Sequence, residues 1–253
     1  MSAVSQLLKK TILELQALPS LSSFALAGGT NLAIRYNHRE SQDIDLFCHD
    51  IVGVTHLQSI VEQAINFYGE KNIIGVQFPA GNENDQYSFL RFFVAQTSDF
   101  MIKVEVIQNM KMMDEVELID GIRLVSLKDI GLFKLISGSS RAAKKDIYDL
   151  DFITEHIPLT ALMEMLQLKQ EKYNQEEDHN IFDLDEDPSP IENPALLLKF
   201  DGKVAQNKIK PIHSNDHIKI EQGSKSWIMA RISWRRKVRQ LFRDWNFQHD
   251  WHK

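Results

Sequence analysis

The chain has 253 residues, longer than a typical single domain, which suggests a core domain with a smaller lobe. Its composition, 43% hydrophobic and 25% charged, is that of an ordinary globular protein and excludes the disordered and fibrous classes. The formal net charge of −6 argues against a protein that coats nucleic acid uniformly, but it is compatible with a local basic patch.

Two further features predict the compartment. Cys48 is the single cysteine, so an internal disulfide is excluded and a reducing environment fits. The start, MSAVSQLLKK, lacks the apolar core of a signal peptide, and no apolar run reaches membrane-spanning length. We therefore expect a cytoplasmic protein with no membrane partner.

The first predicted elements are a helix and a strand. Apolar residues recur every three or four positions from Val4 to Leu15, and Pro19 ends this helix. The run from Ser23 to Ala27 is typical of a short buried strand. Both elements are expected to build the core.

A glycine pair joins this strand to a second helix. Gly28 and Gly29 form a turn, and Thr30 with Asn31 supplies N-cap chemistry before a helical run from Leu32 to Tyr36. Such a turn leaves backbone N–H groups aimed outward, where an anion such as a triphosphate can bind without interference from a Cβ atom. A lone glycine pair is, however, more often only a turn.

Two aspartates follow on a predicted strand. Polar and apolar residues alternate from Asp43 to Phe47, so Asp43 and Asp45 lie on one face, roughly 7 Å apart along the strand. Parallel carboxylates repel each other unless a cation lies between them, and hard oxygen ligands of this kind suit Mg²⁺ or Mn²⁺. The alternative is a strand whose acidic face is simply solvated.

The string GGTNLAIRYNHRESQDIDLF resembles the first motif of the AbiEii/AbiGii family of nucleotidyltransferase-like toxins, within the DNA polymerase β-type nucleotidyltransferase superfamily. The family pattern is a Gly-Gly-Thr/Ser turn, an apolar helix, a His-Arg pair and Ser-x-Asp-x-Asp, and every part is present. The resemblance implies an α+β fold: a nucleotidyltransferase-type core with a small mixed β-sheet flanked by helices, plus a helical C-terminal lobe. It also implies a toxin of a bacterial toxin–antitoxin or phage-defence pair.

The same resemblance implies how an NTP is bound. Asp43 and Asp45 would hold divalent ions, and Arg39 would steady the triphosphate or the motif loop. The residues implied to bind the triphosphate are Gly28, Gly29, Thr30, Ser41 and Lys134.

Three strands are predicted after a helix that Thr55 caps and Gly69 ends. Turn-rich segments separate these strands, which favours an antiparallel meander. In the superfamily a third acid on a neighbouring strand completes the metal site. Glu105 is the candidate here, although aspartate is the usual residue. Alternatively, Lys103 and Glu105 form an ordinary exposed strand face. The predicted strands are Asn72 to Phe78, Tyr87 to Ala95 and Met101 to Ile107.

A second motif combines two predicted helices. Ser126 caps the first, the segment from Ser137 to Ser140 breaks it, and the second begins near Arg141. Lys134, Arg141 and Asp146 resemble a family spacing, which implies that Lys134 contacts the nucleotide phosphates and that Asp146 supports the site. Alternatively, Lys134 lies along an amphipathic helix, while Asp146 and Asp149 pair with Lys144 and Lys145.

The C-terminal part carries a basic helix. A helix from Pro158 to Tyr173 precedes an acidic linker from Gln175 to Pro194, and a further helix runs from about Lys225 to Trp245. A basic stripe on this last helix could follow a phosphate backbone. Alternatively, its arginines pair with the acidic linker or line the nucleotide cleft. The predicted apolar face is Trp227, Trp234, Val238, Leu241 and Trp245, and the basic residues are Arg231, Arg235, Arg236, Lys237, Arg239 and Arg243.

We predict a nucleotidyltransferase core over residues 1–155 and a helical lobe over residues 156–253, with the acidic linker at about 175–194. The expected reaction moves a nucleoside monophosphate from an NTP to an acceptor hydroxyl, with Mg²⁺ or Mn²⁺ as the metal. Expected partners are the NTP, tRNA through the basic helix and a cognate antitoxin. The predicted catalytic residues are Asp43, Asp45, Lys134 and Asp146, and the metal ligands are Asp43, Asp45 and Glu105.

Two alternatives remain open. The acceptor could be a small molecule or a protein side chain, and the absence of RNA binding would favour that. A non-catalytic nucleotide- or RNA-binding protein on the same scaffold is the other possibility, against which both motif aspartates count.

Overall fold

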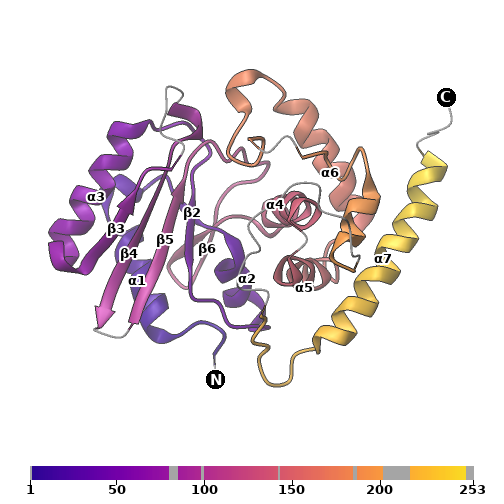
Figure 1. The fold of residues 1–253 in the computed structure, drawn as a ribbon, viewed down its shortest axis with the longest axis horizontal. Coiled ribbons are helices and arrows are strands. Elements are labelled where there is room, and N and C mark those ends of the chain that lie inside the picture. The colour runs from indigo at the N-terminus through magenta and orange to yellow at the C-terminus, as the bar shows by residue number, and fades with distance from the viewer. Residues whose placement is uncertain are drawn as a thin grey trace. The chain divides into compact units, whose positions relative to one another are not determined.

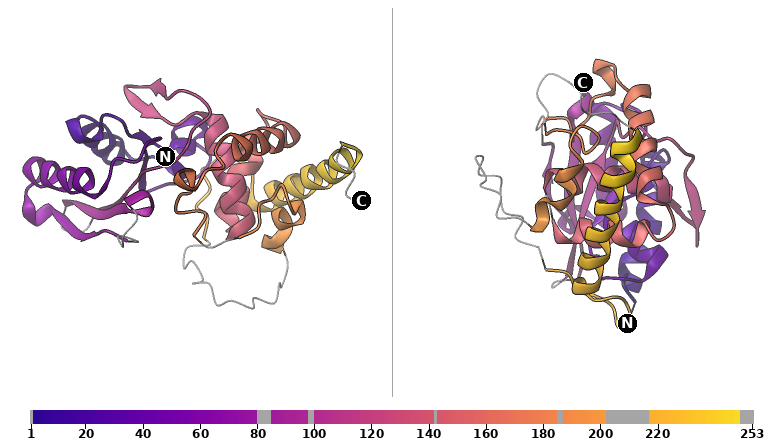
Figure 2. Two further views of the ribbon diagram at one scale, coloured as in Figure 1. Left: turned by 90° about the horizontal axis from the view of Figure 1, so that it is seen from above. Right: turned by 90° about the vertical axis from the view of Figure 1, so that its right-hand side faces the viewer.

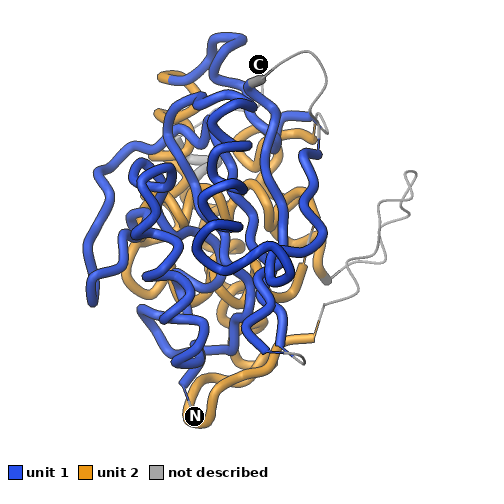
Figure 3. The backbone as a smooth tube through the Cα atoms, turned by 90° about the vertical axis from the view of Figure 1, so that its left-hand side faces the viewer, with its two compact units in different colours: residues 1–126, 173–184 blue, residues 127–172, 185–253 orange. Residues whose placement is uncertain are grey.

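The computed structural model describes residues 2–79, 85–97, 100–141, 143–184, 187–201 and 217–248. The chain forms two compact units (Figure 3), one of Met1–Ser126 with Tyr173–Leu184 and one of Leu127–Lys172 with Asp185–Lys253. The contacts thus divide the chain after residue 126, whereas the predicted boundary between core and lobe lies at 155. That boundary stays a prediction about domains.

A seven-stranded sheet forms the first unit, with the strand order β3-β4-β5-β2-β1-β7-β6. β1 runs parallel to β7 and β2 parallel to β5, whereas the other neighbours are antiparallel. The predicted mixed sheet and the antiparallel meander of β3, β4 and β5 are therefore confirmed. The strands are β1 (Ala25–Leu26), β2 (Ile44–Phe47), β3 (Ile73–Gln77), β4 (Phe89–Thr97), β5 (Phe100–Ile107), β6 (Glu117–Ile119) and β7 (Ile122–Leu124).

Two helices cover one face of this sheet, namely α1 (Gln6–Gln16) and α3 (Val54–Tyr68) (Figures 1 and 2). Their buried apolar side chains join those of the central strands in one core, to which Leu8, Leu57 and Val104 belong. Because side chains alternate along a strand, the residues next to these buried ones point to the opposite face. The polar residues of β2 and β5 lie there.

The third helix of the first unit, α2 (Gly28–Tyr36), begins earlier than predicted. Gly28 has a φ of +62°, which turns the chain from β1 directly into the helix. Thr30 and Asn31 are therefore buried inside the helix and do not cap it. The predicted Thr55 cap of α3 is also wrong, since Gly53 occupies that position, whereas the predicted stop at Gly69 is confirmed.

The second unit is built from helices. They are α4 (Leu127–Ser140), α5 (Lys144–Ile153), α6 (Leu159–Lys172), the 3₁₀ segment η5 (Pro194–Asp201) and α7 (Trp227–Gln248). α7 packs against α5, α6 and η5. In the described ranges of the chain, none of the helices combines the length and the apolar character that crossing a membrane requires.

α4 continues through the segment from Ser137 to Ser140, where the sequence predicts a break. Packing explains the difference. A Cβ atom on Gly138 would lie 3.1 Å from Leu150 Cδ1, so the glycine allows α5 to approach α4 closely. Ser139 Oγ donates to the Ile136 carbonyl 2.9 Å away, which keeps its hydroxyl inside the helix.

Candidate active site

The register of β2 and β5 gathers four charged side chains on one face of the sheet. In this parallel pair Ile44 lies opposite Val104, and Asp45 lies opposite Glu105. Ile44 and Val104 are buried on the covered face. Asp45, Lys103 and Glu105 consequently share the other face, and Asp43, directly before β2, joins them, since its Oδ2 lies 3.6 Å from Lys103 Nζ.

Glu105 is already engaged by two cationic side chains. Its Oε1 accepts from Arg91 Nε at 2.8 Å and lies 2.7 Å from Arg91 Nη2, and its Oε2 accepts from Lys103 Nζ at 3.1 Å. Burial raises the pKa of Glu105, but the charges of Lys103 and Arg91 outweigh it and hold that pKa below its usual range. Glu105 is therefore an ionised carboxylate with a partner on each oxygen.

Lys103 is the cation among these acids. Its Nζ lies 3.6 Å from Asp43 Oδ2 as well as 3.1 Å from Glu105 Oε2. Burial lowers the pKa of Lys103, yet Glu105, Asp43 and Asp45 together raise it above its ordinary value. The sequence predicts Lys103 only as a residue of an exposed strand face, because the pairing of β2 with β5 is not visible in either strand alone.

Over the part of the chain that the structure describes, no group of three or more His, Cys, Asp or Glu side chains lies close enough together to hold a metal ion. Asp43 and Asp45 thus form a two-carboxylate face, with Glu105 turned to Lys103 and Arg91. The role of Glu105 as third ligand stays a prediction.

The glycine pair makes room for two side chains. A Cβ atom on Gly28 would lie 1.9 Å from Asp45 Oδ2, and one on Gly29 would lie 2.3 Å from Arg39 Nη2. The Asp45 carboxylate therefore lies against the first turn of α2, where helix polarity favours a negative charge. No side chain of the N-cap residue, Ala27, bonds to this turn. The predicted triphosphate contacts of Gly28 and Gly29 stay a prediction.

Thr30, Ser41 and Arg39, which the resemblance assigns to the triphosphate, make contacts that hold the loop before β2. Thr30 is fully buried; its Oγ1 donates to the Asp43 carbonyl at 2.5 Å and lies 2.8 Å from Ser41 Oγ. Arg39 is buried and its Nη1 donates to the Glu40 carbonyl at 3.1 Å. These contacts fix the backbone that carries Asp43, and the predicted phosphate contacts are untested.

The second motif folds into a buried ionic cluster within the second unit. Lys134 Nζ lies 2.7 Å from Asp146 Oδ1 and 2.8 Å from Asp149 Oδ2, while Arg141 Nε lies 2.6 Å from Asp146 Oδ2. Burial raises the pKa of Asp146, but Lys134 and Arg141 outweigh it and hold that pKa well below its usual range. The predicted set of Lys134, Arg141 and Asp146 is thus brought together.

A second buried carboxylate in this unit, Asp151, was not singled out in the sequence. Lys225 Nζ lies 2.6 Å from its Oδ2, and Lys237 Nζ lies 2.8 Å from its Oδ1 and 2.9 Å from Thr154 Oγ1. Lys237 therefore points into the unit. The prediction that it belongs to the basic surface of α7 is wrong. The available signal was the position of Asp151 on the apolar side of a predicted helix, where a buried carboxylate needs a cationic partner.

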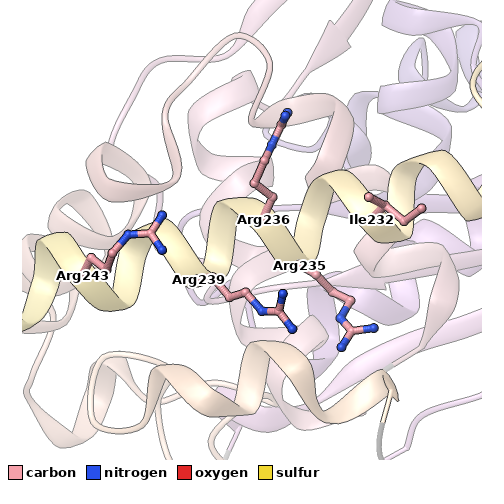
Figure 4. A pocket seen from close by; sticks show the side chains of 5 residues that line it. All are labelled: Ile232, Arg235, Arg236, Arg239 and Arg243. Carbon is pink, nitrogen blue, oxygen red and sulfur yellow. The ribbon is translucent and has the colours of Figure 1, made fainter.

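α7 presents arginines away from its buried side. Trp234, Val238 and Leu241 are buried as predicted, and Trp234 Nε1 donates to the Leu197 carbonyl at 2.9 Å. Side chains of α7 line a pocket of about 480 Å³, and in Figure 4 Arg236 leaves the helix on the side opposite to Arg235 and Arg239. The lining residues are Ile232, Arg235, Arg236, Arg239 and Arg243. Trp245 lies in a stretch whose side chains are outside the description.

Comparisons with known proteins concern the family and the fold. A family model described as "Nucleotidyl transferase AbiEii toxin, Type IV TA system" matches residues 13–222. An uncharacterised protein of Aquifex aeolicus is 27% identical over 142 residues, which cover 52% of this chain and 58% of that protein. The chain thus matches somewhat more than half the length of this curated relative.

A solved structure has a similar fold. MenT4, a nucleotidyltransferase toxin from Mycobacterium tuberculosis, superposes with a TM-score of 0.53 over 92% of this chain and 81% of its own. The two sequences are 14% identical, so the similarity concerns the fold.

Proposed function

The chain belongs to the family of AbiEii nucleotidyl transferase toxins, and on this premise we propose that it transfers a nucleoside monophosphate from an NTP to an acceptor hydroxyl. The observation that carries the proposal is the placement of Asp45 on β2, against the glycine turn that opens α2, with Asp43 directly before this strand. In the reaction a bond forms between the acceptor oxygen and the α-phosphorus, the bond to the bridging oxygen breaks, and pyrophosphate leaves with the acceptor proton released to solvent.

The two aspartates fit a divalent ion such as Mg²⁺ or Mn²⁺. Asp45 is held in a cradle that a Cβ atom on Gly28 would fill, and the Asp43 side chain is 47% exposed and so accessible to a substrate. Carboxylates of this kind, completed by substrate phosphates and water, are the ligands such ions prefer. A bound ion would lower the pKa of the attacking hydroxyl and neutralise charge on the leaving pyrophosphate.

The remaining residues of the proposed site divide into binding and positioning groups. Gly28 and Gly29 offer backbone N–H groups to the triphosphate, and Arg39 is placed against Gly29. Thr30 and Ser41 position Asp43 through its backbone. Within the second unit, Asp146 positions Lys134, to which the family resemblance assigns a contact with the phosphates.

We propose tRNA as the acceptor, because an exposed run of arginines on α7 suits a phosphate backbone. The family description supports a cognate antitoxin as a further partner. The cytoplasm, which holds both NTPs and tRNA, is the proposed compartment.

The first experiment is incubation with each α-³²P-labelled NTP, Mg²⁺ and total tRNA. We expect label in tRNA with the wild type and none with Asp43→Ala. Asp50→Ala is the matched control, since Asp50 is exposed in the same unit just beyond β2, and it should retain transfer.

The outcomes distinguish the alternatives. Label in a protein or small molecule, with none in tRNA, would keep the reaction and replace the acceptor. Absence of transfer from every NTP, with nucleotide binding preserved, would favour a non-catalytic binding protein. Equal transfer by wild type and Asp43→Ala would refute the site.

A further inference from the structure

Lys103 of β5 is a cation among the acidic side chains of the proposed site. Lys103 Nζ lies 3.1 Å from Glu105 Oε2 and 3.6 Å from Asp43 Oδ2, and its side chain is 31% exposed. Val104 of β5 pairs with Ile44 of β2. Lys103 precedes Val104 and Asp43 precedes Ile44, so Lys103 and Asp43 are neighbours. The ammonium group therefore lies between an accessible carboxylate and a more buried one.

The charges on this face have to be balanced. Three carboxylates on adjacent strands repel one another, and like charges directly opposite are destabilising. A divalent ion at Asp43 and Asp45 would approach the same Asp43 carboxylate that Lys103 faces at 3.6 Å. Two cations beside one carboxylate repel each other, so the two compete.

We propose that Lys103 is the resident counter-ion of the Asp43 and Asp45 site, which a divalent metal displaces, and that Glu105 positions this lysine instead of ligating the metal. This inference rests on the proposed function, since that function requires the divalent ion. Because Lys103 is paired with Glu105 as well as with Asp43, it can leave Asp43 and still keep a counter-charge.

The surroundings of Glu105 support its positioning role. Arg91 lies opposite Glu105 in the pairing of β4 with β5, and two of its nitrogens lie within 2.8 Å of Oε1. Oε2 accepts from Lys103. A divalent ion on Oε2 would lie beside the Lys103 ammonium group and be repelled by it, and one on Oε1 would have to compete with Arg91 for the oxygen's lone pairs.

The test is titration of the full chain with Mn²⁺ in an isothermal calorimeter. Lys103→Met should bind Mn²⁺ about threefold to tenfold more tightly than the wild type, because the competing charge is gone. Lys103→Arg, which retains the charge, should bind as the wild type does. Lys71→Met removes an exposed lysine of the same unit and is the matched control.

A second readout separates this role from simple packing. Without metal, Lys103→Met should melt at a lower temperature than the wild type, since Asp43 and Glu105 lose the ammonium group between them, and saturating Mn²⁺ should remove that difference. A purely structural lysine would leave a variant that is destabilised with and without metal and gains no affinity. That result, or Mn²⁺ affinity equal to or below that of the wild type, would overturn the proposal.

Glu105 is tested in the background of Lys103→Met. If Glu105 acts through the lysine, the double variant Lys103→Met/Glu105→Gln binds Mn²⁺ as tightly as Lys103→Met alone. If Glu105 is a ligand, the double variant loses roughly tenfold or more in affinity. The second result would overturn the assignment of Glu105.

Failure of this inference differs from failure of the proposed function. Metal-dependent transfer that requires Asp43, together with unchanged affinity in Lys103→Met, would keep the function and reject the counter-ion. If neither the wild type nor Lys103→Met binds Mn²⁺, the counter-ion is rejected, and the transfer assay then decides the function independently.

Discussion

Gly28 illustrates how one residue fixes the position of a carboxylate. Its positive φ turns β1 into α2, and its missing side chain leaves the space that the Asp45 carboxylate occupies. The sequence marked Gly28 and Asp45 separately, one as part of an anion-binding turn and the other as a metal ligand. Their direct contact depends on the pairing of β1 with β2, which a local pattern does not contain.

We expect Gly28→Ala to lower the free energy of unfolding by about 2–4 kcal/mol, from backbone strain and displacement of Asp45. Transfer activity should fall roughly a hundredfold, because a metal ligand is misplaced. Urea denaturation and the tRNA-labelling assay measure the two effects.

Gly223→Ala is the control for this substitution. Gly223 also has a positive φ, of +87°, but nothing lies within 4 Å of the position of its Cβ atom. Gly223→Ala should lower the free energy of unfolding by about 1–2 kcal/mol and leave the transfer activity unchanged. Equal losses of activity in the two variants would contradict the role given to Gly28.

At the scale of elements, the strongly patterned segments were predicted, whereas the hairpin of β6 and β7 was not. The meander of β3, β4 and β5 follows from alternation over long strands. The hairpin of β6 and β7 has strands too short to show a period, although Asp120 and Gly121, both with positive φ, form the Asp-Gly signal of a tight turn. The continuation of α4 through Gly138 depends on packing against α5, so the residues of α4 alone do not predict it.

The buried cluster of α4 and α5 should respond to acid. The folded state holds the pKa of Asp146 below its unfolded value of about 3.9, so the stability it contributes is present above that pH and is lost as the pH falls through and below it. The wild type should lose stability between about pH 5 and pH 3 more steeply than Asp146→Asn, which lacks this titration.

At pH 7, Asp146→Asn should itself cost about 3–5 kcal/mol, because Lys134 and Arg141 lose a buried partner. Urea denaturation at each pH measures both effects. Glu164→Gln, on an exposed position of α6, should follow the wild type. Parallel pH profiles for wild type and Asp146→Asn would contradict the explanation.

The attachment of α7 within its unit depends on Trp234. This side chain is fully buried and donates to the Leu197 carbonyl, so Trp234→Phe leaves an acceptor unpaired and a small cavity. We expect a loss of about 1–3 kcal/mol in the free energy of unfolding. Ile232→Ala, at a position 64% exposed, should change it by less than about 0.5 kcal/mol. Equal effects in thermal or urea denaturation would refute this account.

For the whole molecule, charge distribution matters more than net charge. The chain carries a formal charge of −6, yet Arg236, Arg239 and Arg243 are exposed on one helix. If tRNA binds there, replacing all three by alanine should weaken binding and reduce the slope of log affinity against log salt by about 2. Lys10→Ala/Lys71→Ala, on the first unit, should leave the slope unchanged. An unaltered slope in the arginine variant would exclude α7 as the RNA contact.

The sequence indicated the family and the two aspartates because both are carried by one contiguous motif. It did not indicate the counter-ion at Lys103 or the division of the chain into units, because these depend on contacts between distant segments. Asn109, for example, donates to the carbonyls of Glu177 and His179, which returns the segment Tyr173–Leu184 to the first unit.

The return of Tyr173–Leu184 to the first unit limits how the gene can be truncated. The chain passes from one unit to the other after residues 126, 172 and 184, so no single truncation point yields either unit intact. A fragment that ends at residue 126 lacks the carbonyls to which Asn109 donates, and one that begins at residue 127 carries Tyr173–Leu184 without its partner. Exchange of one unit between relatives by recombination would likewise need more than one crossover, so the two units are expected to be inherited together.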